Sequence, residues 1–230
     1  AYLLDIGGGT LKFKSAFGSG FRAPSPFEIE YNAGAFAFPP ASLLSLAQEE
    51  SEGWEAGVEY FTGDLRIEAV YFDQDVENAI FFDLSGFSGY LQDTGTSTSK
   101  GFELSAELPL SDSLRLNGNY TYNDTERPDG TQRLRRPKHL FNAGLMYSTL
   151  DGRLTLNGFY RSQADSIDAG NLAIDDFGVF DLTGSYQVTE SIRLYGRLEN
   201  LLDEDYQEID DFNAADLAAY VGISLSFAGL

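Results

Sequence analysis

The stretch Leu114–Asn123 reads LRLNGNYTYN, and two kinds of residue alternate along it. Leucine, glycine and tyrosine occupy the even positions, whereas arginine, asparagine and threonine occupy the odd positions. Successive side chains of a β-strand point to opposite faces of its sheet. This period of two therefore predicts a strand with one apolar face and one polar face.

The same alternation recurs along the chain and predicts about eleven strands, whereas no segment shows a helical stripe. Several runs have about the 9–11 residues that a tilted strand needs to cross a bilayer. The runs are 2–6, 10–18, 54–61, 65–82, 90–110, 114–125, 135–148, 153–165, 176–188, 192–203 and 219–228.

The predicted connections alternate between short and long. The short ones are Gly7–Gly9, Thr62–Asp64, Ser111–Ser113, Thr149–Gly152 and Thr189–Ser191. The long ones are Ser19–Gly53, Asp83–Gly89, Glu126–Leu134, Ser166–Asp175 and Glu204–Ala218. Outer-membrane barrels have short periplasmic turns and longer external loops, so this parity favours a barrel. If the last strand ends at the periplasm, every short turn lies on that side.

Aromatic residues near the ends of the runs are typical of interfacial girdles. They are Tyr60, Phe61, Tyr71, Phe72, Tyr120, Tyr122, Tyr147, Tyr160 and Phe227. The alternative is the ordinary preference of aromatic residues for strands. A soluble meander with one wetted face also fits the alternation, so both solutions stay open on pattern alone.

The charge of the chain excludes several classes of partner. There are 36 acidic and 15 basic residues, for a net charge of -21. A nucleic-acid partner would require a basic face, and docking on an anionic lipid surface would require one too. The chain has no cysteine, so disulfides and thiolate metal sites are excluded. It begins Ala-Tyr-Leu-Leu inside a predicted strand, and we expect a fragment or a processed product.

Six segments, in order along the chain, resemble the barrel of TonB-dependent outer-membrane receptors. They are GFRAPSPFE at 20–28, EESEGWEAGVE at 49–59, KGFE at 100–103, NYTYNDT at 119–125, LRRPKH at 134–139 and LENLLDEDYQ at 198–207. The final segment Tyr220–Phe227 resembles the last strand of that family. LRRPKH and LENLLDEDYQ look most like vitamin B12 receptors, and siderophore receptors share much of this pattern.

The resemblance implies an all-β fold, an antiparallel up-and-down transmembrane β-barrel of about 22 strands closed around a plug. Residues 1–230 would supply about eleven of those strands, the C-terminal half; the plug domain and the N-terminal strands are then absent from this chain. The implied function is TonB-dependent uptake of a scarce metal chelate, cobalamin in preference to a ferric siderophore, in the outer membrane of a Gram-negative bacterium. The implied partners are outer-membrane lipid, the plug, the missing strands, the TonB complex through the missing N-terminal region, and the chelate.

Two features depart from the family pattern. The chain ends Phe227-Ala228-Gly229-Leu230, so the usual terminal aromatic lies three residues in from the end. The stretch Ile209–Ala218 lacks the Gly-Arg element that is common before the last strand. These departures affect the expected contacts of the outermost loop.

The long connection Ser19–Gly53 is the expected ligand-gathering mouth, because aromatic residues with few charges suit a bulky organometallic ligand. The candidate substrate contacts, all expected in external loops, are Phe21, Arg22, Tyr31, Phe36 and Phe38. The alternative for each aromatic residue is packing of the loops on one another.

Charged residues on the polar face of the runs are expected to face the lumen and the plug. They are Arg66, Glu68, Glu103, Arg115, Arg193, Arg197 and Glu199. We expect the inward arginines, with Arg161, to pair with Glu68, Glu103, Glu107 or Glu199, or with the plug. The alternative is a hydrated lumen wall.

No catalytic residue, metal site or cofactor is predicted. His139 is the single histidine, and its neighbours look like the start of a strand, which disfavours a catalytic triad. The acids of segment 203–211 lack the spacing of an EF-hand, and Gly7-Gly8-Gly9 has no lysine of a phosphate loop after it. The rival functions are a passive porin and a surface-exposed β adhesion protein.

Overall fold

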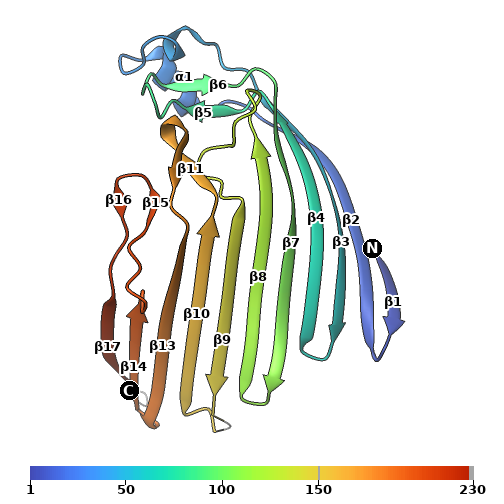
Figure 1. Cartoon of the computed structure of the whole chain (residues 1–230), viewed down its shortest axis with the longest axis vertical. Helices are drawn as coiled ribbons and strands as arrows, with labels where there is room; N and C mark the ends of the chain where they lie inside the picture. Colours follow the sequence, from blue (N-terminus) through green and yellow to red (C-terminus); the bar gives the residue numbers. More distant parts are fainter. Residues whose placement is uncertain (150, 228–230) are drawn as a thin grey trace.

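One large antiparallel sheet dominates the structure (Figure 1). The computed structural model describes residues 1–149 and 151–227. Each strand of the sheet pairs with the next one in the chain, and the order of the 11 strands confirms the predicted up-and-down arrangement. The strands are β1 (Tyr2–Ile6), β2 (Gly9–Arg22), β3 (Glu49–Thr62), β4 (Leu65–Glu77), β7 (Thr96–Ser111), β8 (Leu114–Glu126), β9 (His139–Ser148), β10 (Leu154–Ala164), β13 (Phe177–Thr189), β14 (Ile192–Glu199) and β17 (Ala218–Leu225).

The connections divide between the two ends of the sheet, as Figure 1 shows. At one end, the turn end, tight hairpins include segments 7–8 and 63–64, where Gly7, Gly8 and Gly63 have positive φ. A positive φ is the conformation that glycine adopts at little steric cost. At the other end, the loop end, five long connections cover 23–48, 78–95, 127–138, 165–176 and 200–217. The predicted parity is confirmed. Leu150, in the predicted turn Thr149–Gly152, and residues 228–230 lie outside the described residues.

The small elements all lie in the connections of the loop end (Figure 1). Their bounds are α1 (Pro26–Ala33), η1 (Ala41–Leu43), β5 (Ile80–Phe82), β6 (Tyr90–Gln92), β11 (Ser166–Asp168), η2 (Ala169–Asn171), β12 (Leu172–Ile174), β15 (Gln207–Ile209) and β16 (Phe212–Asn213). In the part of the chain that the structure describes, no helix is long and apolar enough to cross a membrane.

The two faces of the sheet differ in chemistry along every long strand, because directly opposed residues share a face. Between β4 and β7, Ala69 pairs with Leu104 and Tyr71 with Phe102 on the apolar face. One residue along, Val70 pairs with Glu103 on the polar face. The register therefore fixes the face of each side chain. We call the apolar side the outer face and the other side the inner wall.

The outer face has no covering layer among the described residues. Val221 is 92% exposed and Phe17 is 70% exposed on strands of the sheet. The buried apolar side chains of the described chain are few, namely Ala41, Ala79, Ile174, Phe177 and Val179. A soluble sandwich would bury the apolar face of its sheet against a second layer. The structure therefore favours the membrane solution over the soluble meander, with lipid as the solvent of the outer face.

A belt of aromatic rings crosses the outer face toward the loop end. Trp54 and Tyr71 lie 5.3 Å apart between ring centroids, Phe102 and Tyr122 5.7 Å, and Phe141 and Tyr160 6.1 Å. A second row on the same face, nearer the turn end, is formed by Tyr60, Tyr147 and Tyr186. Two such rows flanking an apolar band are what outer-membrane barrels present to lipid.

The predicted aromatic girdle was wrong at Phe61 and Phe72, and its last member, Phe227, lies outside the strands. The register puts Phe61 opposite Arg66 and Phe72 opposite Gly101, so both phenylalanines face the inner wall. A pair of adjacent aromatic residues cannot share a face, because the period of a strand is two. Phe227 follows the end of β17.

The predicted boundaries fail beyond the aromatic belt. β2 continues to Arg22, and β3 already begins at Glu49. The predicted runs 65–82 and 90–110 are each interrupted, at Asn78 and at Gly95, where the backbone has a positive φ. The connection predicted as Asp83–Gly89 is therefore 78–95 and contains the hairpin β5–β6. Outside the lipid both faces of a strand are wet, so apolar alternation no longer marks where it ends.

Candidate functional site

The inner wall carries the seven charged residues that were predicted to face the lumen. The register puts them on one side of the sheet: Arg66, Glu68, Glu103, Arg115, Arg193, Arg197 and Glu199. The seven residues therefore share one face of the sheet, and that this face meets a lumen or a plug stays a prediction. The wall is polar over most of its height, which suits a hydrated lumen.

The ion pairs of the wall differ from the predicted ones, with one exception. Arg197 pairs with Glu199 at 3.1 Å, as expected. Arg66 pairs instead with Glu59 at 2.6 Å, and Lys12 contacts the same carboxylate at 3.2 Å. Arg115 pairs with Asp64 and Arg161 with Glu208, which lie in a turn and a loop. The diagonal contacts depend on register, which the sequence does not give.

Glu59 is the wall residue that sequence reasoning missed. Its side chain is 5% exposed, and its carboxylate pairs with Lys12 of β2 and Arg66 of β4. Two lysines on the preceding run, Lys12 and Lys14, could have indicated it, because lysines on the polar face of a strand are stabilised by an acid on the neighbouring strand. Glu59 thus links β2, β3 and β4 across the wall.

Two of the predicted mouth residues are not in a loop. Phe21 and Arg22 are the last residues of β2. Phe21 lies opposite Glu50 on the outer face and is 74% exposed, so it points away from the lumen side. The expected loop position of both residues is wrong, because β2 continues beyond the aromatic belt. Arg22, opposite Glu49, belongs to the inner wall.

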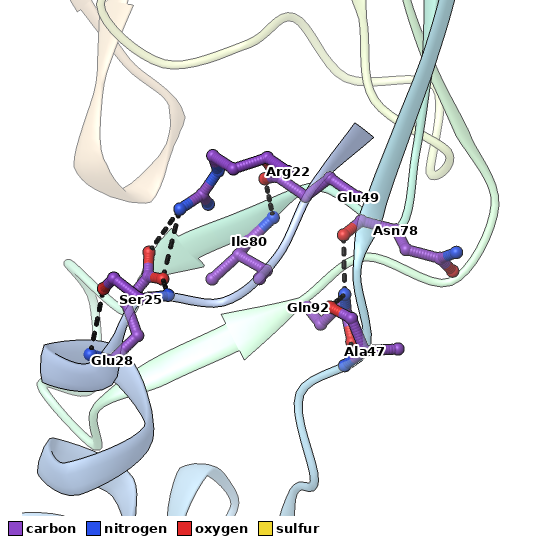
Figure 2. Close-up of polar contacts among 8 residues, drawn as sticks. All are labelled: Arg22, Ser25, Glu28, Ala47, Glu49, Asn78, Ile80 and Gln92. Atoms are coloured by element: carbon purple, nitrogen blue, oxygen red, sulfur yellow. Dashed lines mark hydrogen bonds and ion pairs between the residues drawn. The ribbon is translucent and has the colours of Figure 1, made fainter. Parts of the chain in front are cut away.

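Arg22 ties the end of β2 to two loops, as Figure 2 shows. Its Nη1 donates to both carboxylate oxygens of Glu28, at 3.0 and 3.1 Å, and its Nε donates to Glu49. The other Glu49 oxygen accepts the amide of Ile80 at 2.6 Å. The guanidinium therefore joins the start of α1, β3 and the hairpin β5–β6.

The segment GFRAPSPFE folds as the start of a capped helix. Ser25 is the N-cap of α1 and Pro26 opens its first turn. Ser25 Oγ accepts the Glu28 amide at 3.2 Å, while the Glu28 carboxylate accepts the Ser25 amide at 2.6 Å, which is a capping box. Burial would raise the pKa of the Glu28 carboxyl, but the Ser25 amide and Arg22 outweigh it and lower the pKa.

The loops of the mouth pack on one another through aromatic rings. Tyr31 lies edge-on to Phe82 and to Tyr90, each at 5.7 Å between centroids. Loop packing, the alternative interpretation, therefore describes Tyr31 best. Phe36 is 81% exposed and Phe38 is 50% exposed, so both remain accessible and their contact with substrate stays a prediction.

Polar contacts join each connection of the loop end to the next. Asn32 holds the backbone of Tyr90 through both its amide atoms, at 2.7 and 2.8 Å. The Gln92 side chain bonds the backbone of Ala47 and of Asn78 (Figure 2). Arg127 bonds Asp93 at 3.0 Å, which joins the next pair of loops.

Asp168 completes this series and is the second residue that sequence reasoning missed. Its side chain is 1% exposed, and one oxygen accepts Arg135 Nε and the Ala169 amide, both at 2.7 Å. The other oxygen accepts the amide of Asp210 at 2.9 Å. Asp168 therefore holds three successive connections, 127–138, 165–176 and 200–217. We call the five linked connections the mouth.

The segments LRRPKH and LENLLDEDYQ have structural roles in the mouth. Arg135, with a φ of 56°, reaches Asp168, and His139 starts β9 and bonds Tyr120 at 2.7 Å. Asn200 accepts the Glu204 amide at 2.9 Å and donates to the Glu204 carbonyl at 2.8 Å. These contacts fold the two loops.

A cavity of about 250 Å³ opens between the hairpin β5–β6 and segment 127–135. We call it the mouth cavity; its lining includes Glu49, Ile80, Phe81, Phe82, Asp93, Arg127, Arg133 and Arg135. Glu49 belongs to the inner wall, and the Arg133 amide bonds Thr125, another inner-wall residue, at 3.3 Å. The cavity thus lies on the lumen side of the mouth. Sequence reasoning did not select Arg127 or Arg133, although the arginine-rich LRRPKH segment was a signal.

Comparisons with known proteins agree with this architecture. A family model described as "TonB dependent receptor-like, beta-barrel" matches residues 9–201. The vitamin B12 transporter BtuB of Vibrio cholerae serotype O1 is 24% identical over 221 residues, which cover 93% of this chain and 34% of that transporter. The metal-pseudopaline receptor CntO of Pseudomonas aeruginosa is 30% identical over 175 residues, 70% of this chain and 24% of that receptor. The chain therefore spans about a third or less of the length of these relatives.

A solved structure shares the fold. The copper transporter OprC superposes with a TM-score of 0.78 over 98% of this chain and 38% of that chain. The sequences are 18% identical, so this likeness establishes the fold alone.

Proposed function

Because the chain belongs to the TonB-dependent receptor β-barrel family of outer-membrane proteins in Gram-negative bacteria, we propose that the whole protein imports a scarce metal chelate. The observation that carries the proposal is a polar inner wall ending in a linked mouth, on a sheet whose outer face suits lipid. Such a wall encloses a wet path through the membrane, and the mouth offers a surface where cargo can bind first.

The chain supplies one arc of the barrel in this proposal. β1 and β17 have no further strand beside them in the described sheet. Their unpaired backbone groups require partners, because hydrocarbon offers no hydrogen bonds. The proposed partners are N-terminal strands that complete a barrel of about 22, with a plug inside it.

Roles follow for the residues of the wall and the mouth. The charged wall residues, from Arg66 to Glu199, contact the plug or the water around it. Phe36 and Phe38 contact cargo, whereas Tyr31 and Arg22 position the loop that carries them. Transport couples to TonB through a segment outside this chain. The cycle makes and breaks no covalent bond, so the protein is a transporter and not an enzyme.

Cobalamin is the first candidate cargo. The vitamin B12 transporter BtuB matches 93% of this chain, and the segments LRRPKH and LENLLDEDYQ resemble that type of receptor. A metal-loaded siderophore-like chelate is the second candidate. The metal-pseudopaline receptor CntO has the higher identity, 30%, although over a shorter part of the chain.

Binding to the full-length receptor tests the cargo. Purified receptor in detergent is titrated with cyanocobalamin and with ferric siderophores, and the dissociation constants are compared. Saturable tight binding of cyanocobalamin alone supports the first candidate, and binding of a siderophore alone replaces it with the second. Uptake into cells that lack TonB then separates active transport from a passive porin. Uptake that continues at an unchanged rate without TonB would refute the coupled mechanism.

A further inference from the structure

Arg133 lines the mouth cavity, and its guanidinium forms no ion pair within the described residues. We infer that the cavity binds an oxyanion of the cargo, a carboxylate or a phosphate group, with Arg133 as the charged anchor. The inference rests on the proposed uptake function and adds to it a chemical class of cargo and the residue that selects it.

The carboxylates of the cavity are already committed to other groups. Glu49 accepts Arg22 on one oxygen and the Ile80 amide on the other. Asp93 accepts Arg127 at 3.0 Å and the Ser97 hydroxyl at 3.4 Å. The guanidinium of Arg135 has its own acid, the buried Asp168.

Arg133 lines the same cavity and has no such acid. Within residues 1–149 and 151–227, no carboxylate forms an ion pair with its guanidinium, and its backbone amide makes its hydrogen bond to Thr125. Burial lowers the pKa of the Arg133 guanidinium, and repulsion from Arg136 acts in the same direction, whereas the more distant charges of Asp93 and Glu49 raise it. Arginine nevertheless stays protonated in proteins. A half-buried guanidinium without an anion is unfavourable, and a bound anion would relieve that cost.

The position of Arg133 favours cargo as the source of the anion. The chain has a net charge of -21, and most of its described cations form ion pairs with acids. The cavity lies beyond the aromatic belt, on the lumen side of the mouth, where incoming cargo arrives first. Phe81 and Phe82 line it beside the arginine, and Arg127 stacks over Phe81 at 4.7 Å. An apolar wall next to a charged anchor is a usual composition for a small-molecule site.

The size of the cavity limits what enters it. Sites that enclose a drug-sized ligand have volumes of about 300–1,000 Å³. The mouth cavity, at about 250 Å³, lies below that range and therefore accommodates one arm of a cargo molecule, not a whole chelate. Guanidinium groups bind carboxylate and phosphate in a two-pronged geometry. The cavity would therefore bind one anionic group of the cargo while the rest of the cargo lies in the mouth.

The test uses the full-length receptor and ligands that differ in the anionic group. Cyanocobalamin has a phosphodiester, and dicyanocobinamide lacks it. Ferric citrate has carboxylates, and ferrioxamine B has neither carboxylate nor phosphate. Affinity is measured for wild type, Arg133→Gln and Arg133→Lys. The matched control is Arg136→Gln, because Arg136 is an exposed arginine in the same loop and does not line the cavity.

We expect Arg133→Gln to weaken binding of the anionic member of the recognised pair by about 10- to 100-fold, the value of a charge-assisted hydrogen bond. Arg133→Lys should recover part of that loss. Arg136→Gln removes a charge that repels Arg133 from outside the cavity, so it should change the affinity much less than Arg133→Gln. The pair that responds distinguishes phosphate from carboxylate. Migration on unheated gels checks that each variant is folded.

Three outcomes would overturn the inference. Equal affinity of wild type and folded Arg133→Gln for the anionic ligand would remove Arg133 as an anchor. Arg133→Gln could also lose equal affinity for the anionic ligand and for the matched ligand that lacks the anion, and melt at a lower temperature without ligand. That result would show that Arg133 pairs with a carboxylate of the plug and not with the cargo. Equal losses in Arg133→Gln and Arg136→Gln would reduce the effect to general charge. If wild type binds none of the four chelates, the proposed function fails first.

Discussion

Replacing Asp168 by alanine tests whether this one buried acid holds three loops of the mouth together. The carboxylate accepts hydrogen bonds from Arg135 and from the amides of Ala169 and Asp210. Each hydrogen bond to a charged group contributes about 1.5–3 kcal/mol. Arg135 is 40% exposed, so its share is discounted for screening by water. We expect Asp168→Ala to lower the free energy of opening these contacts by about 2–4 kcal/mol.

Amide hydrogen exchange of the full-length receptor measures this opening directly. A change of about 1.4 kcal/mol corresponds to a tenfold change in the opening equilibrium. The Asp210 amide should therefore exchange about 30- to 1,000-fold faster in Asp168→Ala. Asp168→Asn keeps a hydrogen-bond acceptor but loses the charge, so its Asp210 amide should exchange at a rate between those of wild type and Asp168→Ala. Asp175→Ala is the control, because Asp175 is an exposed acid in the same connection.

The hydrogen bonds of the Asp168 carboxylate also predict that the opening of these loops depends on pH. Burial would raise the pKa of the Asp168 carboxyl, but Arg135 and the amides of Asp210 and Ala169 outweigh it and lower the pKa. A carboxyl with a lowered folded pKa gives its full stabilisation above the ordinary value of about 3.9, and loses it as the pH falls through the folded value. Opening in wild type should therefore stay constant from neutral pH down to about 4 and increase below it. Equal protection of the Asp210 amide in wild type and Asp168→Ala would refute the reasoning.

Three further predictions concern the helix cap, the wall and the outer face. Ser25→Ala should destabilise α1 by about 1 kcal/mol, measured as faster exchange of the Glu28 amide with unchanged exchange in the strands. Glu59→Gln should lower the stability of the folded barrel by about 3–5 kcal/mol in urea, because Lys12 and Arg66 lose their shared acid; an unchanged midpoint would contradict this. Leu104→Arg should cost about 2–4 kcal/mol of folding free energy in vesicles, whereas Glu103→Arg, one residue along on the inner wall, should cost much less.

The strands could be predicted because two different solvents lie on either side of the sheet. Residues such as Leu104 and Glu103 alternate because one faces hydrocarbon and the other faces the lumen, and that contrast is readable in any sequence of this kind. The contrast disappears beyond the aromatic belt. The last residues of β2, which include Phe21 and Arg22, therefore looked like loop, and the break at Asn78 was not visible.

The site was only half predictable, for a related reason. The face of each wall residue follows from parity, and Arg66 and Glu199 lie on the polar face that the alternation predicts. Ion-pair partners depend on the stagger between strands, which parity does not contain, so the pairing of Arg66 with Glu59 was missed. Contacts between loops far apart in the chain, such as Arg135 with Asp168, leave no local pattern at all.

The wall and the mouth are stabilised by different interactions, and this separates their stabilities. The wall is held by continuous ladders of backbone hydrogen bonds, to which ion pairs such as those of Glu59 add. The mouth is held by a few side chains, with Arg22 at one side and Asp168 at the other. Local opening energies follow the contacts that must break, so the loops can open while the strands stay paired. In the proposed function, a cargo that engages Arg133, on the connection that Arg135 ties to Asp168, can therefore rearrange the loops while the strands of the wall stay paired.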